Sequence, residues 1–201
     1  MIVKQLKVGM MENLCYILGC EQTGKGVVID PGDDPEQILS EIQNPGLDIE
    51  YILNTHFHFD HTQCNQDVKE STNAYITMHM DDIPYYQAPV DIVLKSGDTI
   101  QCGEEINLQV LHTPGHTPGG VCFYGDGRLF TGDTLFVGDS GRTDLPYSNR
   151  NSLGASIREL MKLPEETMIF PGHDYGATPT STLREEKRNN VNAKEYGFYQ
   201  P

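Results

Sequence analysis

Three histidines and an aspartate stand within seven residues of this chain. The segment THFHFDH, residues 55–61, contains His56, His58, Asp60 and His61, although the whole chain has only seven histidines. Imidazole nitrogens and carboxylate oxygens are ligands for zinc and iron, and an open catalytic site needs about three protein ligands besides water. The alternation projects His56, His58 and Asp60 to one side, so that His61 can face a second ion. The segment therefore predicts a metal site.

Three further donors stand where predicted strands end. INLQVLHTPGH ends at His116, GRLFTGD ends at Asp133 and TMIFPGH ends at His173. With the first cluster they make seven donors, which is enough for two ions that share a carboxylate. We expect these strand ends to meet, because α/β proteins place their active sites where polar residues gather at strand ends.

The elements that must position these donors are visible as runs of apolar residues. NLCYILGC and KGVVIDPG flank a Gly-Lys-Gly turn and predict a hairpin. DDPEQILSEI predicts a helix with a cap at Asp33 or Asp34 and proline near its first position. IEYILNTHF is a short strand that runs into the first cluster. A helix at 65–72, the strand AYITM and a helix in SLGASIRELMKL complete a mixed sheet covered by helices.

Composition and charge narrow the class of protein. The chain has 201 residues, 37% apolar and 21% charged, which fits one globular domain over residues 1–201. Its net charge of −15 argues against nucleic acid as a partner. The one basic cluster, REEKR at 184–188, is interleaved with glutamates and indicates a solvated helix face.

The predicted location is the cytoplasm. The sequence shows neither an apolar run long enough for a membrane span nor a secretory signal, so we expect no membrane partner. Five cysteines without a CxxC pair argue against a disulfide framework or a thiolate zinc site, and fit a reducing compartment. We expect the cysteines to be buried in the core.

The motifs THFHFDH, TPGHTPGG, TGDTLF and PGHDYG, in this order, resemble the metallo-β-lactamase superfamily and, more narrowly, its glyoxalase II-like branch. The resemblance covers about residues 27–190. It implies an α/β fold of the four-layer αββα type with a metal site at one edge. It also implies that one ion is held by His56, His58 and His116, the other by Asp60, His61 and His173, and that Asp133 bridges them.

Two activities share these ligands. Glyoxalase II-like enzymes hydrolyse thioesters such as S-lactoylglutathione with two divalent ions, of which zinc is expected first and iron or manganese are alternatives. The ions lower the pKa of a bridging water toward about 7, and Asp60 would orient the resulting hydroxide as a catalytic residue. In persulfide dioxygenases, a single iron is held by the equivalents of His56, His116 and Asp133. The first activity is the primary prediction and the second is its alternative.

The same resemblance bears on which thiol carrier is expected and on whether the chain could be a non-catalytic module. With 201 residues, the sequence is expected to lack the glutathione-binding domain of full-length glyoxalase II, and GRTD replaces that enzyme's usual residues after the bridging aspartate. It is more similar to short single-domain enzymes, which leaves the thiol carrier open. The expected partner is a small-molecule thioester or thiol-derived substrate, and a homodimer is left open. A metal-binding module without turnover would predict a missing ligand, whereas all seven donors are present.

Several residues have two interpretations. Asp30 of VVIDPG is expected to support the backbone of the metal loop, and its alternative is to cap the following helix. Arg142 could bind a substrate carboxylate or pair with Asp144, and Tyr175 could donate to substrate or pack beside a ligand. His79 and His112 are expected to be structural or exposed. STLREEKRNN predicts a Ser/Thr helix cap, with Glu185 or Glu186 completing a capping box.

Overall fold

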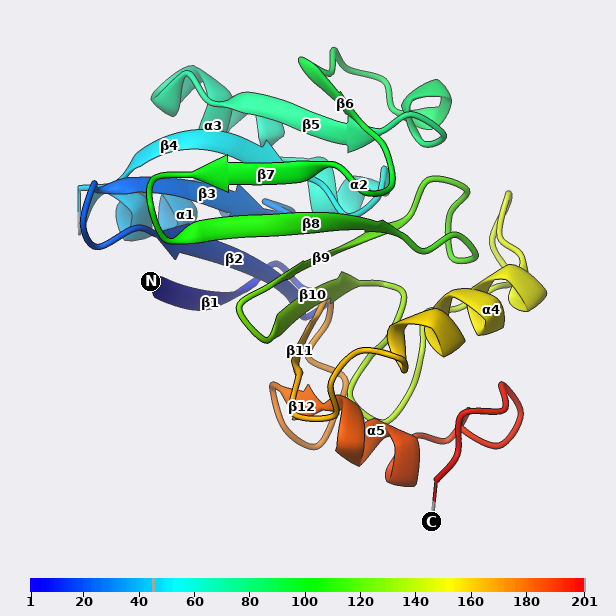
Figure 1. Ribbon diagram of the computed structural model, residues 1–201. Coiled ribbons are helices and arrows are strands. Elements are labelled where there is room, and N and C mark those ends of the chain that lie inside the picture. Colours follow the sequence, from blue (N-terminus) through cyan, green and yellow to red (C-terminus); the bar gives the residue numbers. More distant parts are fainter. Residues whose placement is uncertain (45, 201) are drawn as a thin grey trace.

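The computed structural model describes residues 1–44 and 46–200, and its strands form two six-stranded sheets (Figure 1). In spatial order, the first sheet contains β1 (Ile2–Val8), β2 (Asn13–Gly19), β3 (Lys25–Ile29), β4 (Asp48–Leu53), β5 (Tyr75–His79) and β6 (Ile92–Leu94). The second contains β12 (Ser181–Thr182), β11 (Met168–Pro171), β10 (Arg128–Gly132), β9 (Val121–Gly125), β8 (Ile106–His112) and β7 (Thr99–Cys102). The helices are α1 (Pro35–Gln43), α2 (Phe59–Thr62), α3 (Asn65–Thr72), the 3-10 turn η1 (Ile83–Tyr85), α4 (Arg150–Leu160) and α5 (Leu183–Asn189).

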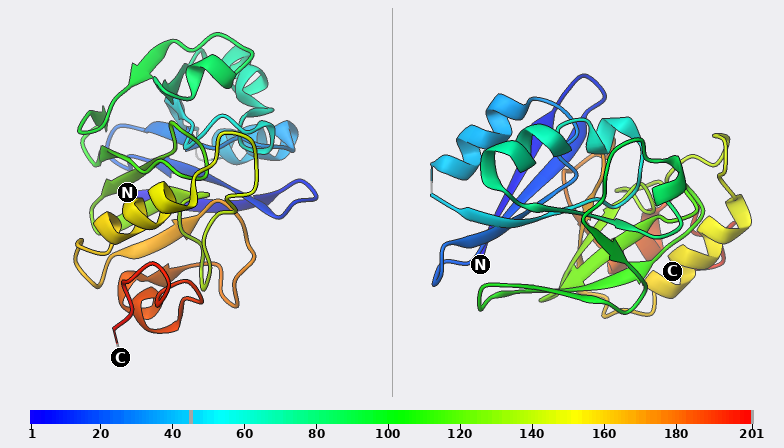
Figure 2. Two further views of the ribbon diagram at one scale, coloured as in Figure 1. Left: turned by 90° about the vertical axis from the view of Figure 1, so that its right-hand side faces the viewer. Right: turned by 90° about the horizontal axis from the view of Figure 1, so that it is seen from above.

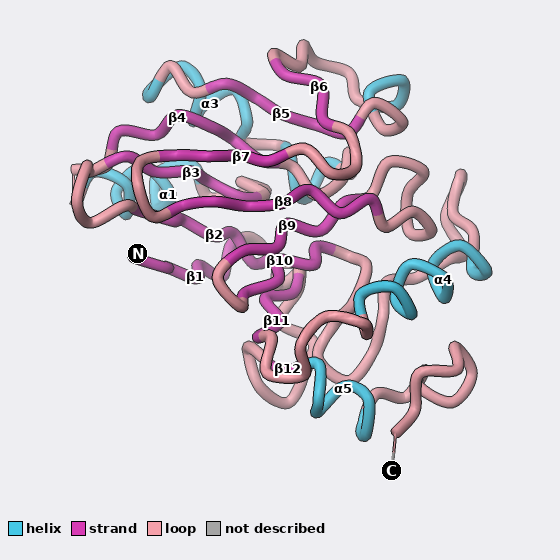
Figure 3. The backbone as a smooth tube through the Cα atoms, in the orientation of Figure 1, coloured by secondary structure: helices cyan, strands magenta, loops and turns pink. Residues whose placement is uncertain are grey.

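Both sheets are mixed. The predicted hairpin of β2 and β3 is antiparallel, with Tyr16 opposite Ile29, whereas β3, β4, β5 and β6 run parallel. In the second sheet only β10 and β11 are parallel. Parallel neighbours need a crossover, and α1 and α3 supply it between β3 and β4 and between β4 and β5. Loops follow β8 and β10 (Figure 3), and these loops can carry the side chains of a site.

The molecule has four layers, with two sheets inside and helices on both outer faces (Figure 2). Apolar side chains of both sheets, such as Tyr16, Phe123 and Phe130, form a buried cluster between them. Ile38 and Ile42 of α1 pack with Val68 of α3 on the outer face of the first sheet. α4 and α5 cover the outer face of the second sheet in a cluster of their own. The expected αββα sandwich is confirmed.

Two predicted helix caps differ in the structure. α1 has Asp34 at the N-cap position, but its carboxylate accepts a hydrogen bond from the Gly9 N–H at 2.9 Å and caps no helical amide. At α5, Thr182 Oγ1 does accept from the Glu185 N–H at 3.2 Å, as predicted. The return half of the capping box is not formed, because Glu185 bonds Asn189, while Glu186 is buried and accepts from the Gly138 N–H. In each case a donor elsewhere in the structure competes for the side chain.

The prediction of a solvated face over residues 184–188 is also wrong in part. Glu186 is 2% exposed and Lys187 is 7% exposed, and Lys187 Nζ lies 3.1 Å from Glu165 Oε1. The five cysteines are buried and free, as expected. None of the helices formed by the described residues has the length and apolar character that crossing a membrane requires.

Candidate metal centre

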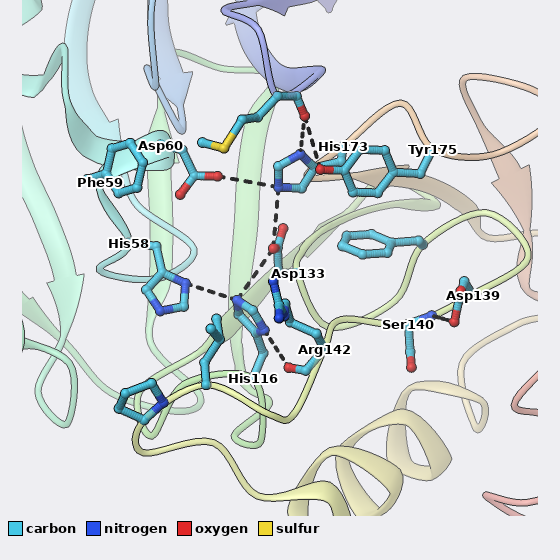
Figure 4. A pocket seen from close by; sticks show the side chains of 14 residues that line it. His58, Phe59, Asp60, His116, Asp133, Asp139, Ser140, Arg142, His173 and Tyr175 are labelled. Atoms are coloured by element: carbon cyan, nitrogen blue, oxygen red, sulfur yellow. Dashed lines mark hydrogen bonds and ion pairs between the residues drawn. The ribbon is translucent and has the colours of Figure 1, made fainter.

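The seven predicted donors meet at one end of the sandwich, although they come from four separate strands. The segment after β4 carries the first four, and the loops after β8, β10 and β11 carry His116, Asp133 and His173. In Figure 4, the side chains of His58, Asp60, His116, Asp133 and His173 surround one common space. The two sheets thus contribute opposite walls of one site.

One group of donors consists of His56, His58 and His116, whose candidate ligand atoms lie within 4.8 Å of one another. His116 Nε2 is 3.0 Å from His58 Nδ1. The other nitrogen of His116, Nδ1, is 2.9 Å from the Arg142 carbonyl oxygen, which can only accept. Nδ1 therefore carries the proton, and Nε2 directs a lone pair into the site. Converging lone pairs of this kind are the arrangement that a cation requires.

The second group consists of Asp60, His61 and His173. His173 Nε2 lies 3.2 Å from His61 Nε2 and 3.5 Å from Asp60 Oδ2. His173 Nδ1 donates to the Met11 carbonyl oxygen at 2.9 Å, so that Nε2 is the ring nitrogen that faces the other donors. The ring of Tyr175 stacks on the His173 ring with centroids 4.6 Å apart, which holds the ring orientation.

Asp133 lies between the two groups. Its Oδ2 is 3.4 Å from both His116 Nε2 and His173 Nε2, and its Oδ1 is 3.3 Å from His61 Nε2. One carboxylate therefore reaches donors of both groups. This is the position that a bridging ligand would take.

Two buried polar atoms test whether these residues fit metal ions. His56 Nε2 and Asp133 Oδ1 are shielded from water, and neither makes a hydrogen bond of regular geometry with a described residue, although Asp133 Oδ1 lies 3.3 Å from His61 Nε2. A buried polar atom without a partner costs about 1–3 kcal/mol, so such atoms need a ligand to complete them. Nitrogen and carboxylate donors with unused lone pairs fit a divalent cation such as zinc or iron.

Burial and charge set the protonation of the donors. Burial lowers the pKa of His56 well below its usual value and lowers the pKa of His58 to about 4, so both rings are neutral and able to bind metal. Burial opposes charge on Asp133 as well, but His61 and His173 outweigh it and hold its pKa well below the usual range. For His61 burial is outweighed by Asp133 and Asp30, which raise its pKa. A divalent cation would replace that proton.

Asp30 lies behind the metal loop. Its Oδ1 accepts from the Thr55 N–H at 2.7 Å, and its Oδ2 accepts from the Thr55 hydroxyl at 2.6 Å. Oδ2 is also 3.0 Å from His61 Nδ1, an arrangement that orients a histidine ligand and fixes its tautomer. Of its two interpretations, the structure places Asp30 against the loop backbone and His61, and not at the cap of α1.

Glycines bring the backbone close to the donors. A Cβ at Gly172 would lie 2.4 Å from Asp133 Oδ1 and 2.9 Å from His61 Cε1. Gly132 has a φ of +46°, and its Cβ would collide with Thr55. Any larger residue at position 172 would have to displace the carboxylate that lies between the two groups.

Two residues that support the site were missed in the sequence. The buried Asn13 donates through Nδ2 to the carbonyl oxygen of Asp60 at 2.9 Å and to Asp60 Oδ2 at 3.0 Å. The fully buried Asp82 accepts from the Phe57 N–H at 3.1 Å, from the Thr117 hydroxyl at 2.9 Å and from the Gly119 N–H. Nothing in the sequence separates Asp82 from its neighbour Asp81, which is half exposed.

The two predicted substrate-binding residues lie at the mouth of the site. A pocket of about 590 Å³ opens onto the donors and is lined by Arg142 and Tyr175 among others. Arg142 already forms a two-pronged ion pair with Asp144, at 2.6 and 2.7 Å. The Tyr175 hydroxyl donates to the Met11 carbonyl oxygen at 3.1 Å. The ion pair with Asp144 was one of the two interpretations of Arg142, and the stacking of Tyr175 on the His173 ring matches the packing interpretation of Tyr175.

His79 and His112 lie outside this centre. Their rings stack with centroids 4.1 Å apart, and His112 Nε2 lies 2.9 Å from the Pro118 carbonyl oxygen. The buried His79 and the half-buried His112 thus link the end of β5 to the loop after β8. This agrees with the structural role expected for them.

The chain is similar in sequence to known metal-dependent hydrolases. Residues 9–173 match the model of a family described as the metallo-beta-lactamase superfamily. The chain is 37% identical to a hydroxyacylglutathione hydrolase of Polaromonas sp. over 87% of its own length and 67% of the relative's. It is 30% identical to a probable polyketide biosynthesis zinc-dependent hydrolase of Bacillus velezensis, over 90% and 82%. The chain spans about two thirds of the hydroxyacylglutathione hydrolases that it matches.

Two solved structures are similar to this chain in both fold and sequence. ETHE1 from Myxococcus xanthus superimposes with a TM-score of 0.87 at 32% identity, covering 99% of this chain and 88% of the other. TTHA1623 in a di-iron-bound form gives a TM-score of 0.83 at 35% identity, covering 94% and 99%. Family model, fold and the convergence of seven donors agree, and the chain belongs to the metallo-β-lactamase superfamily.

Proposed function

We propose that this chain is a hydrolase with two metal ions that cleaves a thioester of a small thiol carrier. The observation that carries the proposal is the position of Asp133, whose two oxygens lie within 3.4 Å of nitrogens from both donor groups. Two complete groups and a carboxylate between them suit a pair of divalent ions. The names of the hydroxyacylglutathione hydrolases support the thioester as the substrate class.

The ligand assignment follows from the two groups. His56, His58 and His116 would hold one ion, Asp60, His61 and His173 would hold the other, and Asp133 would contact both. When bound, two divalent ions lower the pKa of a water molecule and polarise the carbonyl under attack. Zinc is the first expectation, and a di-iron form of a similar structure keeps iron as an alternative.

Contacts within the protein orient the carboxylate of Asp60 and the rings of two histidine donors. Asn13 Nδ2 donates to Asp60 Oδ2 at 3.0 Å, which would leave Oδ1 of the same carboxylate able to accept a hydrogen bond from the attacking water and orient it. The Arg142 and Met11 carbonyl oxygens fix the rings of His116 and His173 through their Nδ1 atoms. No serine or cysteine nucleophile is needed, and Cys64, three residues beyond the first cluster, is buried with its pKa raised to about 12 by burial.

A second candidate is a persulfide dioxygenase with one iron, held by His56, His116 and Asp133. The similarity to ETHE1 fits this alternative as well as it fits the hydrolase. The remaining donors would then surround the iron site without binding a second ion.

Metal content and two activity assays separate these candidates. The protein is purified without chelator or added metal, and its metals are counted per chain by mass spectrometry. Thiol release from S-lactoylglutathione and from an uncharged thioester is followed with a thiol reagent, and oxygen uptake is followed with a persulfide. About two ions per chain with thiol release supports the hydrolase. About one iron with oxygen uptake and no thiol release would replace the proposal by its alternative. His58→Ala should damage hydrolysis far more than oxygen uptake.

A further inference from the structure

The walls of the pocket beyond the metal donors are largely apolar. They are formed by Met11, Phe59, Phe136, Leu145, Pro146 and Tyr175. Phe59 is 66% exposed and Tyr175 is 58% exposed, so that two large side chains present apolar surface at the mouth of the site. A concave site with exposed apolar walls and a few convergent polar groups is typical of a binding site for an apolar ligand.

This apolar surface continues into a second hollow. A space of about 230 Å³ lies beside the pocket and shares Met11, Phe59 and Asp60 with it. Met10, which is 99% exposed, lines the second hollow and not the first. An extended group that starts at the donors can therefore pass over Met11 and Phe59 and end beside Met10.

Charge around both hollows is unfavourable to carboxylates. Among the described residues that line them, Arg142 is the one with a positive charge, and Asp144 neutralises it through two hydrogen bonds. Asp33 and Asp139 stand in the outer walls without contributing to the metal donors. Two divalent ions at the centre would carry more charge than Asp60 and Asp133 neutralise, but that charge lies at the donors and not in the outer walls. A carboxylate near the mouth would meet Asp33 and Asp139, and the described lining residues offer it no cationic side chain that is not already paired.

We infer that the site selects a thioester with an extended apolar acyl group, attached to a thiol that carries no carboxylate near its sulfur. This inference rests on the hydrolase function proposed above and names its substrate class. Met11 and Phe59 act as binding residues for the acyl group, and Met10 contacts its far end. Arg142 is held by Asp144 as part of the wall.

The acyl arm of the test uses S-acetyl, S-butyryl, S-hexanoyl and S-octanoyl N-acetylcysteamine with zinc-loaded protein. Because burial of a methylene is favourable, kcat/KM should rise by roughly twofold to threefold per methylene on this partly open surface. Met10→Ser should lower the ratio of octanoyl to acetyl kcat/KM. Met168→Ser, which changes an exposed methionine on β11 outside both hollows, is the matched control and should leave the ratio unchanged.

The charge arm compares S-hexanoyl N-acetylcysteamine with the S-hexanoyl thioester of 3-mercaptopropionate, which adds one carboxylate. The uncharged thioester should have a kcat/KM about threefold to tenfold higher. Asp144→Asn releases Arg142 and should narrow this difference. Adding Arg142→Gln to Asp144→Asn removes the released cation and should restore the difference.

The outcomes separate the inference from the proposed function. A rise with acyl length together with preference for the uncharged thiol supports both. Hydrolysis that is independent of acyl length, or that is faster for the carboxylate-bearing thioester, overturns the inference and leaves the hydrolase standing. If neither zinc-loaded nor iron-loaded protein cleaves any of these thioesters or S-lactoylglutathione, the proposed function fails and the inference fails with it.

Discussion

Asp82 offers the sharpest test of how the metal centre is held. It is fully buried, and its hydrogen bonds to described residues go to neighbours of the metal donors and not to the donors themselves. Its Oδ2 accepts from the Phe57 N–H, between His56 and His58, and from the Thr117 hydroxyl, next to His116. Its Oδ1 accepts from the Gly119 N–H. One carboxylate therefore joins the loop after β4 to the loop after β8, and these two loops carry the three histidines of one donor group.

Asp82→Asn keeps the size of the side chain and removes its charge. The amide oxygen can replace Oδ2 and keep two hydrogen bonds, but the amide NH2 then faces the Gly119 N–H. A buried N–H without an acceptor costs about 1–3 kcal/mol, and the lost bond was one to a charged acceptor. This loss of unfolding free energy should be offset in part at neutral pH, because Asp82→Asn also removes a charge that burial makes unfavourable in the folded state. Because the loops lose their common anchor, we expect about tenfold weaker metal binding at the histidine group.

The assay has two readouts and a matched control. Zinc affinity is measured by competition with a chromophoric chelator, and the unfolding free energy of the metal-free protein is measured in urea. Asp81→Asn changes the neighbouring, half-exposed carboxylate, which contacts neither metal loop among the described hydrogen bonds, and should change stability by less than about 0.5 kcal/mol. Thr117→Val removes only one donor and serves if Asp82→Asn fails to fold.

The result that would refute this reasoning is specific. If Asp82→Asn binds both zinc ions as tightly as the wild type, or if Asp81→Asn weakens them equally, Asp82 does not position the histidines. If Asp82→Asn lowers stability but leaves zinc affinity unchanged, its role is in folding alone.

Further expectations concern the donors, a glycine and pH. Asp133→Ala should abolish activity and lower the zinc content, measured by mass spectrometry, below two ions per chain. Two ions per chain in this variant would contradict the proposal that Asp133 contacts both ions. Gly172→Ala places a Cβ 2.4 Å from Asp133 Oδ1 and should weaken zinc binding at least about tenfold by chelator competition, while far-ultraviolet circular dichroism stays unchanged. Burial raises the pKa of Asp82 to about 6 from 3.8, so the folded state binds this proton more tightly than the unfolded state does. The protonated carboxyl therefore contributes to stability fully below pH 4, and this contribution is lost as the pH rises through 6. Urea unfolding of the metal-free proteins should therefore show the wild type losing up to about 3 kcal/mol relative to Asp82→Asn between pH 4 and pH 7, and parallel pH curves would contradict the assignment.

Much of the fold could be predicted from local patterns. The hairpin of β2 and β3, the helices α1, α3 and α4 and the strand before the first cluster follow from apolar runs and from turn residues, because burial of a face imposes a period on the chain. The αββα arrangement itself came from a resemblance in four motifs, and the structure and the family match confirm it. The caps were less predictable, since Asp34 and Glu186 found partners far along the chain.

The sequence by itself determined which residue types stand at the strand ends, and this was enough to expect a metal site of seven donors. Only the tertiary structure decided which side chains surround them. Asn13, at the start of β2, and Asp82, just before η1, belong to no motif, and Asp82 is buried while its neighbour Asp81 is half exposed. The pairing of Arg142 with Asp144 was one of two local alternatives. Such choices depend on distances between segments far apart in the chain, and these distances exist only once both sheets have packed.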